Sequence, residues 1–142
     1  MPAGAGTQAS PFVVDTLPFV DAGDTSESNE RAIDRYSCST SNEAGAEVWY
    51  ELILSESRTL RMAAYDAEDG VDVDLHILRG GKAGNNCLRR DNRIFDPISL
   101  DAGTYYVVVD TYTSSSSGEK PGLFSFFIQD VPQYNATACW RN

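Results

Sequence analysis

The sequence contains few of the residues on which catalytic and metal sites most often depend. It has one histidine, His76, and three cysteines, Cys38, Cys87 and Cys139. A zinc site usually combines four Cys or His ligands, some of them close in sequence, so this composition argues against one. A Ser–His or Cys–His nucleophile would depend on His76 alone, and no GxSxG-type turn is present. We therefore do not expect the chain to be an enzyme.

Basic residues and long apolar runs are also scarce. Eleven Lys and Arg stand against 21 Asp and Glu, which gives a net charge of −10. Such a surface repels phosphate groups, so we expect neither nucleic acid nor a membrane as a partner. No apolar run approaches the ~20 residues that cross a bilayer. The opening MPAGAGTQASPFVV lacks the regions of a signal peptide; a cytosolic protein and a mature secreted domain with a start Met are the alternatives.

Helical periodicity is missing as well, and short runs of alternating polarity recur instead. We predict strands at 46–54, 59–65, 71–78, 103–112 and 122–128. Strands at this spacing without intervening helices predict an all-β fold, an antiparallel jelly-roll-like β-sandwich. A length of 142 residues fits a single domain. We expect residues 1–14 to be a flexible lead-in or an edge strand, and residues 15–142 to be the sandwich.

The stretch EDGVDVDLHIL contains a strand that follows an acidic loop. Alternation places Val71, Val73, Leu75 and Ile77 on the buried face, and Asp72, Asp74 and His76 on an outer face that we expect to be solvated. The loop offers carboxylates of the type that calcium prefers, from Asp66, Glu68, Asp69 and Asp72. Their spacing does not fit an EF-hand. An irregular calcium site and ion pairs with Arg89, Arg90 and Arg93 are the alternatives.

The three cysteines allow one disulfide and one leftover thiol, which favours an oxidising compartment. Cys38 precedes the first strong strand and Cys139 follows the last one. Because the two ends of a sandwich often meet, we expect a Cys38–Cys139 disulfide. Cys87 would then be buried or would link two chains.

Four motifs follow one another along the chain: DTLPFVDAGDTSESNERAIDRYSC, EAGAEVWYELIL, DVDLHIL, and LDAGTYYVVVDTY with GLFSFFI after it. In this order and spacing, over about residues 15 to 130, they resemble the bacterial pre-peptidase C-terminal (PPC) domain family, which is related to collagen-binding-domain-like modules. Two departures stand out. The family often has two nearby cysteines where this chain has only Cys87, and its final G-x-Y is Gly122-Leu123-Phe124 here.

The resemblance implies a jelly-roll β-sandwich that is not itself catalytic and that accompanies secreted enzymes. Relatives bind calcium and insoluble substrates such as collagen, and their calcium ion joins the lead-in to the strand that begins at Glu47 in this chain. Carried over, this implies a set of calcium ligands that we rank ahead of the acidic loop: Asp21, Asp24, Asn42, Glu43 and Glu47.

We therefore expect a secreted accessory module that binds an extracellular matrix or polymer, with calcium as the candidate cofactor. Trp49 lies on the strand face opposite Tyr50, so it either contacts a ligand or packs beneath a loop. The alternative function is a structural subunit that self-associates into an extracellular assembly. In that case the segment GAGTQASPFVV would add as a strand to the open sheet edge of a neighbour.

Overall fold

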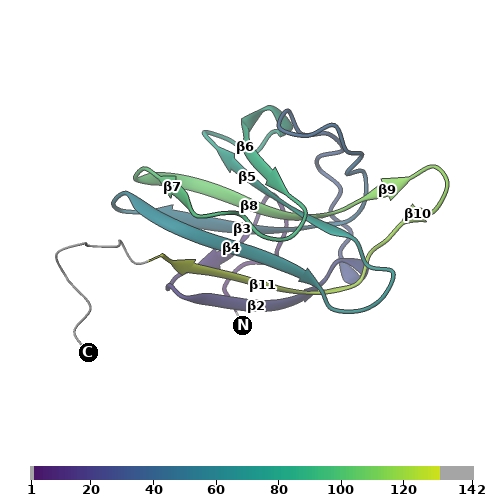
Figure 1. The fold of residues 1–142 in the computed structure, drawn as a ribbon, viewed down its shortest axis with the longest axis horizontal. Coiled ribbons are helices and arrows are strands. Elements are labelled where there is room, and N and C mark those ends of the chain that lie inside the picture. Colours follow the sequence, from purple (N-terminus) through teal and green to yellow (C-terminus); the bar gives the residue numbers. More distant parts are fainter. Residues whose placement is uncertain (1, 132–142) are drawn as a thin grey trace.

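The computed structural model describes residues 2–131, which form two packed sheets (Figure 1). The strands are β1 (Phe12–Val14), β2 (Phe19–Asp24), β3 (Glu47–Leu54), β4 (Arg58–Asp66), β5 (Val73–Arg79), β6 (Cys87–Asp91), β7 (Ile98–Leu100), β8 (Gly103–Thr111), β9 (Thr113–Ser114), β10 (Gly118–Glu119) and β11 (Leu123–Asp130). Two 3-10 turns are present, η1 (Thr25–Glu27) and η2 (Gly84–Asn86). Within residues 2–131, no helix has the length and hydrophobicity needed to cross a membrane.

The predicted fold class, an all-β sandwich in a single domain, is confirmed. The predicted strands correspond to β3, β4, β5, β8 and β11. Their β-branched and aromatic side chains pack well on a pleated surface, which is why the pattern was informative. β2, β6 and β7 were not predicted. β2 contains Gly23 and two aspartates, β6 contains two arginines, and β7 is only 3 residues long.

The strand order is β1-β3-β8-β5-β6 in the five-stranded sheet and β2-β11-β4-β7 in the four-stranded sheet, and β9 and β10 form a separate hairpin. All pairs are antiparallel except β1, which runs parallel to β3 with Phe12 opposite Tyr50. The lead-in is further held by a hydrogen bond from the Trp49 amide to the Gly6 carbonyl (2.9 Å). The segment considered for strand addition to a neighbour therefore pairs within its own chain.

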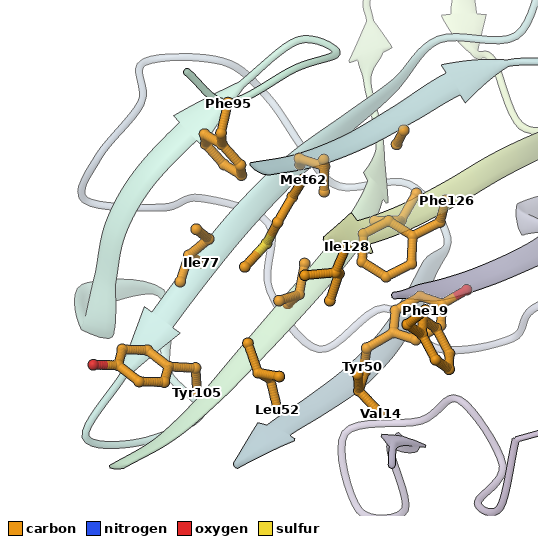
Figure 2. Close-up of a cluster of buried hydrophobic side chains, with 14 of the residues drawn as sticks. Val14, Phe19, Tyr50, Leu52, Met62, Ile77, Phe95, Tyr105, Phe126 and Ile128 are labelled. Atoms are coloured by element: carbon orange, nitrogen blue, oxygen red, sulfur yellow. The ribbon is translucent and has the colours of Figure 1, made fainter. Parts of the chain in front are cut away.

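The main core lies between the two sheets, as Figure 2 shows. Tyr50 of β3 meets Phe126 of β11 with ring centroids 4.4 Å apart, and the Phe19 ring lies at 5.9 Å from Tyr50. Ile77 of β5 and Leu52 of β3 also point into this core. Each fully buried side chain of this size contributes about 1.5–3 kcal/mol through removal of apolar surface from water. The predicted inward face of the 71–78 run is confirmed by this packing.

A second, smaller cluster lies on the outer face of the five-stranded sheet, beneath residues 28–46, which we call the covering segment. Ile33 and Tyr36 of this segment pack against Trp49, Leu78 and Val108. Two backbone hydrogen bonds shape the segment, from the Glu47 amide to the Glu30 carbonyl and from the Glu43 amide to the Asp34 carbonyl, both 2.9 Å. The part of this outer face around Trp49, Leu78 and Val108 is therefore an interior surface.

The disulfide joins Cys38 of the covering segment to Cys87 at the start of β6, with the Cα atoms 5.6 Å apart. The expected Cys38–Cys139 disulfide is therefore wrong, and so is the expectation for Cys87. Cys139 lies outside the described residues. The prediction assumed that Cys38 lies at the end of the sandwich, whereas the covering segment carries it across a sheet face to β6.

Candidate functional site

A groove with a volume of about 800 Å³ lies where the edge strands β1 and β2 of the two sheets come together. Consecutive β2 residues 21–24 line the groove. Because successive residues point to opposite faces of a strand, this lining means that the backbone edge of β2 faces the groove. Within residues 2–131, no strand pairs with that edge. Pro2, Gly6 and Phe12 of the lead-in and β1 also line it.

The groove is acidic. Asp21, Asp24, Glu27 and Glu30 line it. Their hydrogen-bond donors are uncharged: the Tyr50 hydroxyl donates to Asp21 (2.7 Å), the Ser26 amide to Asp24 (2.9 Å) and the Gln8 amide to Glu30 (2.8 Å). None of the ion pairs within residues 2–131 includes these four carboxylates. The groove therefore carries uncompensated negative charge along an unpaired strand edge.

A second candidate surface is the open outer face of the four-stranded sheet. Phe127 of β11 pairs with Val20 of β2 on one side and with Ala63 of β4 on the other. Ala63 in turn forms an isolated bridge with Ile94. The Tyr65 ring stacks on Phe127, with centroids 6.0 Å apart and planes at 30°. Val20 is 76% exposed, Ile94 40% and Tyr65 38%. We call Val20, Tyr65, Ile94 and Phe127 the outer-face patch.

A third feature is a network of buried polar side chains under the covering segment. Tyr36 stacks on His76 (centroids 3.7 Å apart, planes at 10°) and donates a hydrogen bond of 2.6 Å to Asp110. Glu47 accepts hydrogen bonds of 2.6 Å from the Ile33 amide and from the Trp49 indole. These contacts join the covering segment to β3, β5 and β8. We call Tyr36, Glu43, Glu47, Asp74, His76, Arg90 and Asp110 the buried network.

Glu43, Glu47, Asp110 and His76 of this network have shifted pKa values. Burial, followed by hydrogen bonding to Asp74, raises the pKa of Glu43 to about 10, and burial lowers the pKa of His76 to about 3. Burial also raises the pKa of Asp110 and Glu47. At neutral pH, Glu43 is therefore protonated and can donate to Asp74, and His76 is neutral. Their 3.9 Å contact is not an ion pair.

The buried network corrects the expectation of a solvated outer face for β5. Asp74 and His76 do lie on that face, but they are 1% and 0% exposed. Arg90 donates to Asp74 at 2.7 Å. His76 contacts only interior groups, so a substrate cannot reach it in this structure. The apolar residues Ile33 and Tyr36 within an otherwise polar loop are the sequence signal that could have revealed a covered face.

Trp49 packs beneath the covering segment and is 0% exposed. Of the two expectations for this residue, packing under a loop is correct and direct contact with a ligand is wrong. The reason is the same as for β5: the strand face opposite the core is not a solvent face here.

The five residues of the implied calcium set do not come together as one set of ligands. Asp21 contacts Tyr50 on the inner face of β3, whereas Glu47 lies on its outer face. Both carboxylate oxygens of Glu47 already accept hydrogen bonds, and Glu43 keeps its proton at neutral pH. Asp24 caps η1, and Asn42 accepts from the Ala44 amide. Calcium binding therefore stays a prediction, one that this five-residue arrangement does not fit.

The residues of the acidic loop have other contacts as well. Asp66 accepts from the Val73 amide (3.1 Å) and lies 3.7 Å from Arg93, and Glu68 accepts from the Leu123 amide (3.5 Å). Burial and the nearby Asp74 and Asp66 raise the pKa of Asp72. Asp69 is exposed. Within residues 2–131, no group of three or more His, Cys, Asp or Glu side chains is arranged to hold a metal ion.

Comparison with known proteins identifies similar folds. The pre-peptidase C-terminal domain of a collagenase from Bacillus anthracis aligns with a TM-score of 0.54 at 13% identity, covering 91% of this chain and 98% of that domain. PliG of Aeromonas hydrophila, a periplasmic inhibitor of g-type lysozyme, aligns with a TM-score of 0.52 at 11% identity, covering 84% and 94%. No family model matches the sequence, and no curated protein matches it. At these identities the likeness is one of fold.

Proposed function

We propose that this chain is a non-catalytic accessory module that works outside the cytoplasm and binds an extracellular matrix or polymer through its outer-face patch. The observation that carries the proposal is the patch itself. Apolar side chains from neighbouring strands gather on one solvent-facing sheet surface, and a stacked pair of aromatic rings lies among them. Contiguous exposed apolar surface of this kind is characteristic of binding sites.

Three further features support this proposal. The Cys38–Cys87 disulfide is typical of proteins from oxidising compartments. The fold resembles a collagenase domain and a periplasmic inhibitor. His76 is buried, so the side chain most suited to acid–base catalysis near neutral pH is inaccessible.

A flat aromatic surface suits a solid polymer better than a small molecule. Tyr65 and Phe127 lie on an open sheet, where they can contact a large, flat partner, while a small ligand would gain little burial there. Val20 and Ile94 extend the surface across the sheet on either side.

The test is retention of the protein on insoluble collagen, chitin and cellulose, measured by depletion from the supernatant. We expect retention on at least one polymer, and at least a tenfold loss of affinity in the double variant Tyr65→Ser/Phe127→Ser. The matched control is Ile53→Ser/Leu88→Ser, which removes two exposed apolar side chains from β3 and β6 of the other sheet. Circular dichroism confirms that each variant is folded.

Absence of retention on all three polymers would refute the proposal. Equal loss of retention in the patch variant and the control variant would refute the assignment to the patch.

A further inference from the structure

We propose that the acidic groove is a second binding site, which takes an extended, basic peptide segment of a partner protein as an added strand on β2. This inference goes beyond the proposed function because the groove lies at the edges of β1 and β2, whereas the outer-face patch lies on a sheet face. Three properties of the groove lead to it: an unpaired backbone edge, a cavity of peptide size and uncompensated negative charge.

The backbone edge sets the mode of binding. β2 is a terminal strand whose one edge pairs with β11 from Phe19 to Asp24, and within residues 2–131 nothing pairs with the other edge. The amide and carbonyl groups of that edge are available to a partner in extended conformation, as in other cases of strand addition. The strand spans Phe19–Asp24, and η1 follows it directly. The pairing length on offer is therefore that of β2, 6 residues.

The cavity gives the partner a place to lie. The volume of about 800 Å³ falls within the range of protein ligand sites, roughly 300–1,000 Å³. Phe12, Val48 and Leu123 supply apolar lining, so alternate side chains of a bound strand can be buried. The walls are formed by the lead-in on one side and β2 with η1 on the other.

The charge identifies the partner. Asp21, Asp24, Glu27 and Glu30 meet no cationic side chain within residues 2–131, so a segment with Lys or Arg would supply the missing counter-charge. A second copy of this chain fits less well, because its net charge is −10 and its extended segment GAGTQASPFVV contains no basic residue. The partner is therefore a basic protein of another kind.

The probe is a synthetic, amide-capped peptide of alternating Lys and Val, with binding measured by calorimetry at low ionic strength. We expect binding that weakens as salt is added, since the attraction between exposed charges is screened. The variant Glu27→Gln/Glu30→Gln should bind roughly five- to tenfold more weakly, because it loses two charge contacts in the groove, one from exposed Glu27 and one from half-buried Glu30. Gln retains an oxygen that can accept the Gln8 amide hydrogen bond. The matched control, Asp69→Asn/Asp96→Asn, removes two exposed charges that do not line the groove.

A second peptide separates strand addition from simple charge attraction. In it, alternate valines are replaced by proline, which keeps every Lys but removes backbone donors and disfavours a paired strand. We expect this peptide to lose binding, and we expect the Lys–Val peptide to shift the amide NMR signals of β2.

Several results would overturn the inference. They are equal binding of both peptides, no binding of the Lys–Val peptide, and equal weakening in the groove and control variants. Concentration-dependent dimerisation that competes with the peptide would identify a second copy as the occupant and would also overturn it. Polymer retention by the outer-face patch is independent of each of these results.

Discussion

The two sheets of this sandwich differ in what their outer faces carry and in whether those faces are covered. The five-stranded sheet carries Glu47, Asp74, His76 and Asp110 on its outer face, and all four are buried beneath the covering segment. The four-stranded sheet carries Val20 and the Tyr65–Phe127 pair on its outer face, where Val20 and Tyr65 are exposed and Phe127 is half-buried. Charged side chains are usually outside and apolar ones inside.

The reversed placement of charged and apolar side chains separates a structural outer face on one sheet from a candidate binding face on the other. Buried charges are tolerated only when hydrogen-bonded or neutralised. Hydrogen bonds from Ile33 and Tyr36 of the covering segment and from Arg90 of β6 reach Glu47 of β3, Asp110 of β8 and Asp74 of β5. The buried face therefore fixes the covering segment in place. Within residues 2–131, the open face instead leaves Val20, Tyr65 and Ile94 exposed, and we propose that it meets a partner. Three predictions test this difference, beginning with the largest effect.

The largest effect is expected from removing the disulfide with Cys38→Ser/Cys87→Ser. The two cysteines are 49 residues apart in sequence, and constraint of a loop of that size in the unfolded chain stabilises a protein by about 4 kcal/mol. We expect a loss of this order in urea unfolding, and faster amide hydrogen exchange in residues 28–46, because the covering segment is no longer attached to β6.

Reduction of the wild-type protein is the independent measurement and should give a similar loss. Polymer retention should not change, since the outer-face patch is on the other sheet. A loss below about 1 kcal/mol would show that the buried network holds the covering segment without the disulfide.

The second effect is a fall in stability as the pH rises from 7 to 9. Glu43 has a folded pKa of about 10 and an ordinary unfolded pKa, so the folded state holds one more proton in this window. For each extra proton that the folded state holds, the free energy of unfolding falls by up to about 1.4 kcal/mol for every unit by which the pH rises. His76, with a folded pKa of about 3, acts in the opposite direction only below about pH 6.5.

The titratable and charged groups that face Glu43 and His76 are Asp72, Asp74, Arg90, Asp110, Tyr36 and Glu47. The raised pKa values of Asp110 and Glu47 have the same sign of effect as that of Glu43. The variant Glu43→Gln should flatten this fall, measured as melting temperature against pH. An unchanged slope in this variant would mean that Glu43 is ionised in the folded protein.

The strands were predictable from the sequence because their alternation is a local pattern. The 71–78 run even gave the correct face for Val73, Leu75 and Ile77. What the pattern could not indicate is whether the second face of a sheet meets water. The covering segment has no periodicity, and Ile33 and Tyr36 were its only local sign of a covered face, so its fold over His76 was not predicted and packing beneath a loop was only one of two expectations for Trp49. The prediction of a Cys38–Cys139 disulfide was wrong for the same reason: Cys38 belongs to the covering segment, which places it beside Cys87.

The candidate sites depended even more on tertiary structure. Val20, Phe127 and Ile94 belong to segments far apart in sequence, and the strand order β2-β11-β4 brings them together. The groove depends on which strands are at the sheet edges, and β2 itself was not predicted. Asp21 and Asp24 were singled out through a family resemblance, and the structure places them along this groove rather than beside Glu47.

The smallest effect comes from removing one tyrosine hydroxyl from each outer face. Tyr36→Phe removes the hydroxyl that donates a hydrogen bond to Asp110 in the buried network. One carboxyl oxygen of Asp110 then lacks a donor, which should lower the free energy of unfolding by about 1–3 kcal/mol. Tyr65→Phe makes the same chemical change on the open face, where the ring is 38% exposed, and should change stability by no more than about 0.5 kcal/mol. Urea unfolding of the two variants side by side measures the difference. If both lose the same stability, the two faces are equally ordered and the distinction between a structural face and a binding face fails.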